Sequence, residues 1–175
     1  MGDPKKSKKK FSRPSQPWES ERIREELILV GSYGLRNKKE VWRAQTKLRN
    51  YRRRARNIRV IPEERQVEET EILIKKLNKL GILPKSASID DVLQLSTSDI
   101  LERRLQTLVY RKGLAKTPYQ SRQFIVHGHI AISGRRVKSP GYMVTAEEEK
   151  EIMYSPTSPL AKNAEHPERQ EGVVS

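Results

Sequence analysis

The chain has 175 residues, only 34% of them hydrophobic, which limits it to one medium-sized core or two small ones. The absence of cysteine excludes disulfides and thiolate zinc sites, and the absence of a long apolar run or a charged-then-apolar leader predicts a soluble, cytoplasmic protein with no membrane partner. A formal net charge of +14 predicts a polyanionic partner.

Residues 1–20 have the composition of a flexible basic arm. Five lysines occupy the six positions from Lys5 to Lys10, and the stretch contains three prolines without any periodicity. A solubilising or targeting tail is one interpretation, and an RNA-binding arm is the other. Trp18 favours the arm, because an aromatic ring beside cations can dock or stack on bases.

Residues 21–97 are predicted to form a helical, arginine-rich region. A short helix covers residues 21–30 and breaks at residues 31–34. A long helix over residues 36–59 has an apolar face of Val41, Ala44, Leu48, Tyr51 and Ala55. Its cationic side chains are Arg36, Lys38, Lys39, Arg43, Lys47, Arg49, Arg52, Arg53, Arg54 and Arg56.

This long helix is expected to bind RNA phosphates. Glu40 is the only acid between Tyr33 and Ile61, whereas a merely solvated charged helix normally interleaves both signs. Arginine also outnumbers lysine, and its planar fork suits paired contacts to phosphate oxygens. A polyanion alongside the helix would relieve the repulsion.

Two further helices precede the second half of the chain. Residues 62–80 begin with acids and carry Val67, Ile72, Leu73 and Leu77 on a broad apolar face, which predicts a core helix ending at Gly81. Residues 88–95 form a short capped helix, and residues 96–99 cap the next one. Neither segment contains a catalytic constellation.

Residues 98–154 are predicted to fold as a small α+β module. Leu101, Leu105 and Leu108 mark one helix that ends at Gly113, with arginines and a lysine on its other side. Residues 117–120 carry the capping signals of a second helix that ends at Gly128. Strands are expected at residues 129–133, 135–138, 142–144 and 151–153, giving two helices on a mostly antiparallel sheet.

Charge is segregated along the chain. Residues 1–60 carry +13, residues 61–100 carry −3, residues 101–146 carry +8 and residues 147–175 carry −4. Two cationic blocks separated by an acidic spacer indicate a polyanion held at two places. The expected RNA-binding side chains of the second block are Arg103, Arg104, Arg111, Lys112, Lys116, Arg122, Gln123, His127, His129, Arg135, Arg136 and Lys138.

Other chemistry has little support in the sequence. His127 and His129 lack the acidic or cysteine neighbours of a metal site, so hydrogen bonding or stacking to RNA competes with a plain surface turn. No glycine-rich loop ends in a Gly-Lys-Ser or Gly-Lys-Thr sequence. We therefore predict no catalytic residue, metal, cofactor or small-molecule substrate. Residues 155–175 are expected to be a flexible acidic tail.

The run GLAKTPYQSRQFIVHGHIAISGRRVKSPGYMV resembles the RNA-binding S-four domain, with Ser121 and Ser133 as small departures from the usual alanine and asparagine. The YGLRNKKE stretch at residues 33–40 and the PWE opening at residues 17–19 are similar to the archaeal and eukaryotic branch of the ribosomal S-four family. This resemblance covers residues 1–155.

The resemblance implies a structural constituent of the small ribosomal subunit. Such a protein binds a multi-helix junction in the 5′ region of small-subunit ribosomal RNA early in assembly. It lies beside other ribosomal proteins near the channel through which messenger RNA enters. The alternatives are an RNA-modifying or tRNA-charging enzyme carrying the same module, and a free-standing stress factor. Residues 1–100 are too short and basic for such a catalytic domain, and the stress factor leaves the N-terminal half unexplained.

Overall fold

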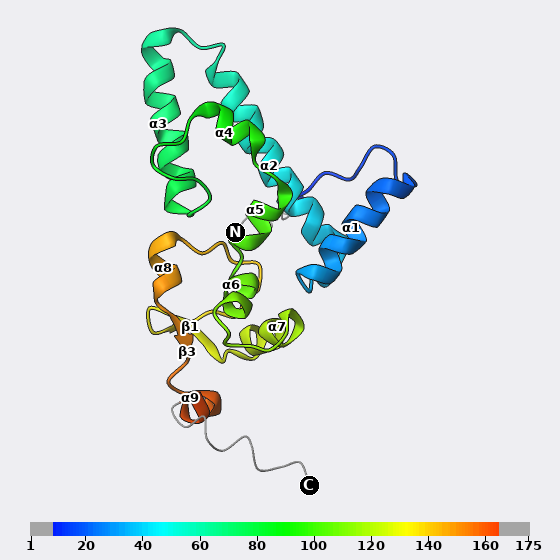
Figure 1. Cartoon of the computed structure of the whole chain (residues 1–175), viewed down its shortest axis with the longest axis vertical. Coiled ribbons are helices and arrows are strands. Elements are labelled where there is room, and N and C mark those ends of the chain that lie inside the picture. The colour runs from blue at the N-terminus through cyan, green and yellow to red at the C-terminus, as the bar shows by residue number, and fades with distance from the viewer. Residues whose placement is uncertain (1–8, 165–175) are drawn as a thin grey trace, which may run out of the picture. The chain divides into compact units, whose positions relative to one another are not determined.

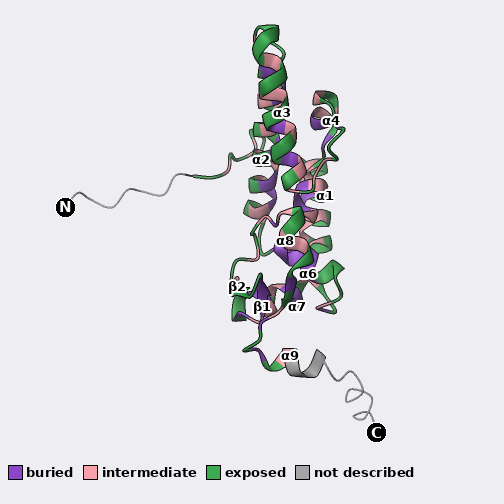
Figure 2. Cartoon of the chain, turned by 90° about the vertical axis from the view of Figure 1, so that its left-hand side faces the viewer, coloured by how far each residue is buried: buried purple, intermediate pink, exposed green. Residues whose placement is uncertain are grey.

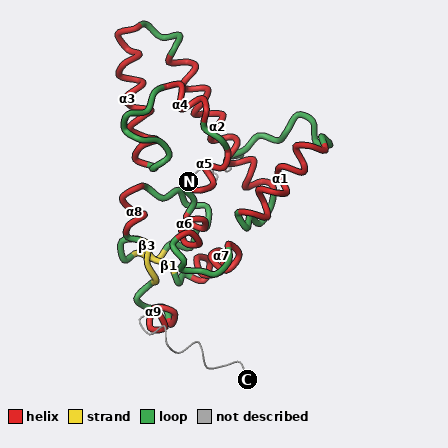
Figure 3. Tube along the Cα trace, viewed as in Figure 1, coloured by secondary structure: helices red, strands yellow, loops and turns green. Residues whose placement is uncertain are grey.

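The computed structural model describes residues 9–164 as a largely helical chain with one small sheet (Figure 1, Figure 3). The chain divides into two compact units. The helical unit comprises residues up to Ile74 together with Ser86–Leu101, and the α+β unit comprises Lys75–Lys85 together with the residues from Glu102 onward. The predicted boundary at residue 98 falls inside α5 (Thr97–Glu102).

The helical unit is built on α1 (Ser20–Ser32) and α2 (Lys38–Ile58), which pack against each other (Figure 1). The buried residues of α2 are Val41, Ala44, Leu48, Ala55 and Ile58, the stripe that its spacing predicts. Tyr51 is only half-buried. Figure 2 shows buried patches on α2 among intermediate and exposed positions.

The start of the described chain lies against α2. The rings of Phe11 and Trp42 have centroids 5.9 Å apart, and the backbone N–H of Ser12 donates to Thr46 Oγ1 at 3.2 Å. Arg49 Nη1 in turn donates to Ser12 Oγ at 2.7 Å. An aromatic contact and side-chain hydrogen bonds thus place part of the predicted arm against α2, whereas its flexibility stays a prediction. Residues 1–8 lie outside the described residues.

The next two helices are α3 (Glu63–Lys79) and α4 (Ile89–Gln94). Within α3, Leu73 and Leu77 are buried, but Val67 and Ile72 are 65% and 50% exposed, so the buried face is narrower than predicted. The N-terminus of α4 carries the expected cap, in which Ser88 and Asp91 form a capping box.

The sheet of the α+β unit has strand order β2-β1-β3, with β1 (Ile130–Ile132) antiparallel to both β2 (Arg135–Arg136) and β3 (Ile152–Tyr154). Ile132 pairs with Arg135, which leaves Ser133 and Gly134 as a two-residue turn. Both turn residues have positive φ, 50° and 75°, as a tight hairpin turn requires. This confirms the predicted hairpin.

Two helices, α6 (Leu105–Arg111) and α7 (Pro118–His127), pack on this sheet. The core cluster consists of Leu105, Leu108, Val109, Ala115, Ile125, Ile130, Ile132, Val144 and Ile152. Thr117 caps α7 by accepting from the N–H of Gln120, and Gly128 ends it in the left-handed conformation at φ 78°. The Gln120 side chain accepts from Lys116 N–H, one residue before the position that the sequence predicts.

The chain departs from the prediction at residues 103 and 104. The sequence predicts a single helix from Leu101 to Gly113. In the structure α5 ends at Glu102, Arg104 has an extended backbone conformation, and α6 begins at the next residue. Leu105 N–H donates to Tyr142 O at 2.9 Å, and Val144 N–H donates to Arg103 O at 3.1 Å. Residues 142–144 thus pair with the backbone between α5 and α6, and the strand predicted there does not join the sheet. The third strand of the sheet is β3 instead.

The C-terminal part begins with α8 (Ala146–Lys150), where Thr145 and Glu148 form a capping box. After β3, Ser155 N–H donates to His129 O at 2.8 Å, and both Ser155 and Ser158 are buried. The helix α9 (Pro159–Ala164) follows. The predicted tail thus contains α9, its flexibility stays a prediction, and residues 165–175 lie outside the described residues.

Candidate nucleic-acid interface

The exposed side of α2 carries a dense row of cations. Burial of the apolar stripe turns the remaining positions outward, and the opposing acid of this helix is Glu40 in its first turn. We call this surface the α2 face. Its exposed members are Lys39, Arg43, Lys47, Arg49, Arg53 and Arg56, together with Arg36 just before the helix begins.

Other predicted binding residues of α2 make contacts within the helical unit. Arg54 Nη2 lies 2.7 Å from Glu69 Oε2, and Lys38 Nζ lies 3.7 Å from Glu26 Oε2. Arg52 Nη2 donates to Leu95 O at 2.5 Å. The side chains of Lys38 and Arg54 remain 35% and 39% exposed, so both cations are still open to solvent, and the pair of Arg54 with the equally exposed Glu69 is weak.

In the α+β unit, cations and imidazoles gather around Gly128. A Cβ atom built on Gly128 would lie 3.4 Å from Lys138 Cε and 3.8 Å from Arg136 Cδ, so both side chains pass close over this glycine. The rings of His127 and His129 have centroids 6.3 Å apart. We call these four side chains the Gly128 patch. Arg136, Lys138 and His127 are exposed, and all three can donate to phosphate oxygens.

His129 is partly used within the unit. Its Nδ1 atom lies 2.8 Å from Ser158 Oγ, and its ring makes an edge contact with Phe124 at a centroid distance of 6.0 Å. These contacts orient the ring and leave Nε2 as the nitrogen available to a ligand. No group of three or more potential metal-ligating side chains occurs in residues 9–164.

Arg103 and Arg104 do not form the exposed helical face that the sequence predicts with Arg111. Arg104 is 7% exposed and pairs with Met143. Arg103 Nη1 lies 2.7 Å from Glu149 Oε2, and its guanidinium covers Gly81, where an added Cβ would meet it at 3.0 Å. The interruption of the helix at these two residues turns both side chains inward.

The remaining predicted residues lie on the surface of the α+β unit. Arg111 Nη2 lies 2.8 Å from Glu102 Oε1, and Arg122 Nη1 donates to Gln106 Oε1 at 3.1 Å. The residues with exposed side chains outside the Gly128 patch are Arg111, Lys112, Lys116, Gln123 and Arg135. Together with the patch they give this unit its own cationic surface.

Known proteins resemble this chain both within the α+β unit and over nearly its whole length. The S4 domain model matches residues 103–150. The small ribosomal subunit protein uS4 of Hyperthermus butylicus is 55% identical over 162 residues, covering 93% of this chain and 92% of that protein. The chain belongs to the uS4 family.

Other uS4 proteins give the same result. That of Ignicoccus hospitalis is 54% identical over 94% of this chain and 99% of its own length. That of Sulfolobus acidocaldarius is 56% identical, with 93% of each chain covered. Membership confirms the predicted class: the chain is a structural constituent of the small ribosomal subunit and not an enzyme, and its location is the cytoplasmic ribosome. Among the described helices none is long and apolar enough to cross a membrane.

The sequence did not reveal one candidate feature of this uS4-family chain, the pocket beside α2 that the docked arm helps to form. Its side chains include Arg13, Arg22 and Gln45, none of which was predicted to bind. They come from separate segments and share no motif. The sequence signal that could have indicated it is the pair of aromatic residues Phe11 and Trp42, whose contact brings the arm to α2.

Proposed function

We propose that this uS4-family chain binds a multi-helix junction in the 5′ region of small-subunit ribosomal RNA, early in assembly, through two cationic surfaces. It would then lie near the channel through which messenger RNA enters, beside neighbouring ribosomal proteins. The α2 face is one surface, and the exposed cations of the α+β unit with the Gly128 patch are the other. Both grip phosphates and read the shape of the RNA.

The observation that carries this proposal is the presence of a separate cationic surface in each compact unit. A single surface can hold one RNA helix, whereas two surfaces on one chain can hold two helices and so favour a junction over a duplex. Phosphate contacts of this kind need no base-specific readout, which suits the many arginines and lysines at these positions.

Salt-dependent binding of the full chain tests the proposal. The wild type is titrated with a small-subunit ribosomal RNA junction and with a duplex of equal length. One variant removes charge from the α2 face (Arg43→Gln with Arg53→Gln), and another removes it from the Gly128 patch (Arg136→Gln with Lys138→Gln). Each pair is expected to lower the salt slope by roughly two and to reduce the preference for the junction.

A matched control removes two exposed charges outside both surfaces, one from each unit, by Arg65→Gln with Lys85→Gln. This variant should retain the junction preference and the slope. Equal affinity of the wild type for junction and duplex would reduce the chain to a general polyanion binder. Binding to RNA free of other ribosomal proteins tests early assembly, because a late-binding protein needs those proteins in place.

A further inference from the structure

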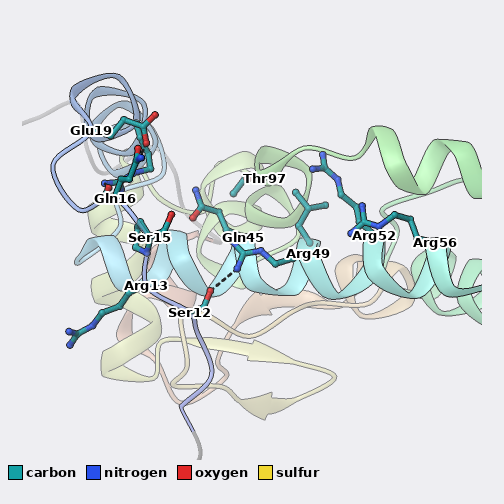
Figure 4. A pocket seen from close by; sticks show the side chains of 13 residues that line it. Ser12, Arg13, Ser15, Gln16, Glu19, Gln45, Arg49, Arg52, Arg56 and Thr97 are labelled. Carbon is teal, nitrogen blue, oxygen red and sulfur yellow. Dashed lines mark hydrogen bonds and ion pairs between the residues drawn. The ribbon is translucent and has the colours of Figure 1, made fainter.

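A polar pocket of about 540 Å³ lies in the helical unit where the arm crosses α2 (Figure 4). In Figure 4, Gln45, Arg49, Arg52 and Arg56 stand along one side of α2, and the arm residues Ser12 and Gln16 approach from its N-terminal half. Spacings of four, three and four residues place these α2 side chains on one face. The volume falls in the range of pockets that hold small ligands.

The charge of this pocket is strongly positive. Arg49, Arg52 and Arg56 line it from α2, whereas Glu19 is the only carboxylate among the lining residues. Glu19 is already engaged, because its Oε2 lies 3.5 Å from Nε of Arg22. The three α2 guanidinium groups therefore face a space that holds no carboxylate for them.

Hydrogen-bonding capacity in the pocket is also incompletely used. Arg52 Nε is buried without a hydrogen-bond partner, while its Nη2 donates to Leu95 O. Arg49 donates to Ser12 Oγ. Within residues 9–164, the Arg56 side chain has neither a hydrogen bond nor an ion pair. The exposed Arg56 guanidinium can therefore donate hydrogen bonds to the oxygen atoms of an anion, whereas Arg52 Nε is closed to solvent and that guanidinium contributes chiefly its charge.

We propose that this pocket holds the phosphate group of one unpaired nucleotide, an inference that rests on the RNA-binding function proposed above. The three α2 guanidiniums bind the phosphate oxygens. Hydroxyl and amide groups around them, from Ser12, Ser15, Thr97 and Gln45, suit ribose hydroxyls and base edges. A nucleotide within a duplex cannot leave its stack to enter such a space without unpairing, so the pocket selects single-stranded RNA.

The experiment compares binding of the full chain to a short oligouridine strand and to an RNA duplex of equal length. Arg49→Gln and Arg56→Gln are each expected to weaken oligouridine binding roughly tenfold, since each removes a charge-assisted contact. Duplex binding should weaken by about threefold or less. The matched variant is Arg43→Gln on the exposed side of the same helix, outside the pocket lining.

Arg49 and Arg56 belong both to the α2 face and to the pocket lining, so the ratio of the two affinities separates the pocket from the rest of the α2 face. Arg43→Gln should lower both affinities alike and leave the ratio unchanged, whereas the pocket variants should change it. An unchanged ratio in both pocket variants overturns the inference while leaving the proposed function standing. A wild type that binds neither a small-subunit RNA junction nor oligouridine overturns the proposed function itself.

Free phosphate compounds are the second possible source of the same chemistry. Uridine 5′-monophosphate and inorganic phosphate are added as competitors of oligouridine binding. Weak competition, needing concentrations far above that of the strand, supports the RNA phosphate as the ligand. Competition by either compound at the concentration of the strand assigns the pocket to a free phosphate and overturns the RNA form of the inference.

Discussion

Replacing Glu26 by alanine should destabilise the helical unit. Glu26 is 1% exposed in α1, and its Oε1 accepts from Arg22 Nη1 at 2.6 Å and from Trp42 Nε1 at 2.9 Å. The second carboxylate oxygen lies 3.7 Å from Lys38 Nζ. One carboxylate thus ties α1 to α2 and orients the ring against which Phe11 packs.

The expected cost follows from these contacts. Each hydrogen bond to a charged group contributes about 1.5–3 kcal/mol, so two of them give roughly 3–6 kcal/mol. The side chains of Arg22 and Lys38 are 18% and 35% exposed, and water recovers part of that loss. We expect Glu26→Ala to lower the free energy of unfolding by about 2–4 kcal/mol. Glu26→Gln keeps an acceptor for Trp42 but loses the charge, and should cost about half as much.

Tryptophan fluorescence during denaturant unfolding measures this cost in the helical unit alone. The chain has two tryptophans, Trp18 and Trp42, and both belong to that unit. Trp18 is already 90% exposed, so Trp42 supplies most of the signal. The control is Glu25→Ala, which removes an exposed neighbour and should change the stability by less than about 0.5 kcal/mol. A loss below that value in Glu26→Ala would refute the role of the buried carboxylate.

Three further outcomes are expected. Gly128→Ala places a side chain at φ 78° and should destabilise the α+β unit by about 1–2 kcal/mol. Gly31→Ala is the control, because no atom lies within 4 Å of the added Cβ, and it should not destabilise the helical unit. Thermal melts followed by circular dichroism compare the two variants. Trp18→Ala should leave stability unchanged and, because the exposed ring can stack on a base, lower the affinity for single-stranded RNA by about 1–3 kcal/mol in an anisotropy titration. The hydrogen bond from the backbone N–H of Thr145 is the main cause that lowers the pKa of Glu148 below its ordinary value, so Glu148 stabilises the fold above that ordinary value and loses this effect as the pH falls through its folded pKa. Glu148→Gln should therefore show a weaker loss of stability in acid than the wild type.

Local signals in the sequence were sufficient for most elements. The stripe from Val41 to Ala55 defines α2, since buried positions three and four residues apart leave little choice of face. Thr117 and Gly128 bound α7 because a side-chain cap and a left-handed glycine act within a few residues of the helix ends. The Ser133-Gly134 hairpin is local in the same sense.

The missed features depend on contacts between distant residues. The leucine spacing continues through Arg103 and Arg104, so nothing local shows the helix breaking there. The break exists because the backbone at this point bonds to residues 142–144. This backbone pairing therefore explains why the helix is interrupted, why residues 142–144 do not join the sheet and why Arg104 is buried.

The residues of the candidate interface also fall into those that local sequence signals could place and those that they could not. Arg43, Arg53 and Lys138 could be placed on the surface from periodicity and charge alone, and the structure leaves them exposed. Arg54 and Arg103 could not be distinguished from them, because their carboxylate partners Glu69 and Glu149 lie far along the chain. The docking of residues 9–19 was likewise invisible in a composition typical of disorder.

The position of β1 at the centre of the sheet has a consequence for synthesis of the chain. Its partner β2 follows within one turn, but β3 begins roughly 20 residues after β1 ends, which takes about one to four seconds at ordinary translation rates. During that interval one edge of β1 has no strand to pair with, and Ile152 is missing from the core. The α+β unit therefore cannot complete its sheet until its last strand has left the ribosome that makes it.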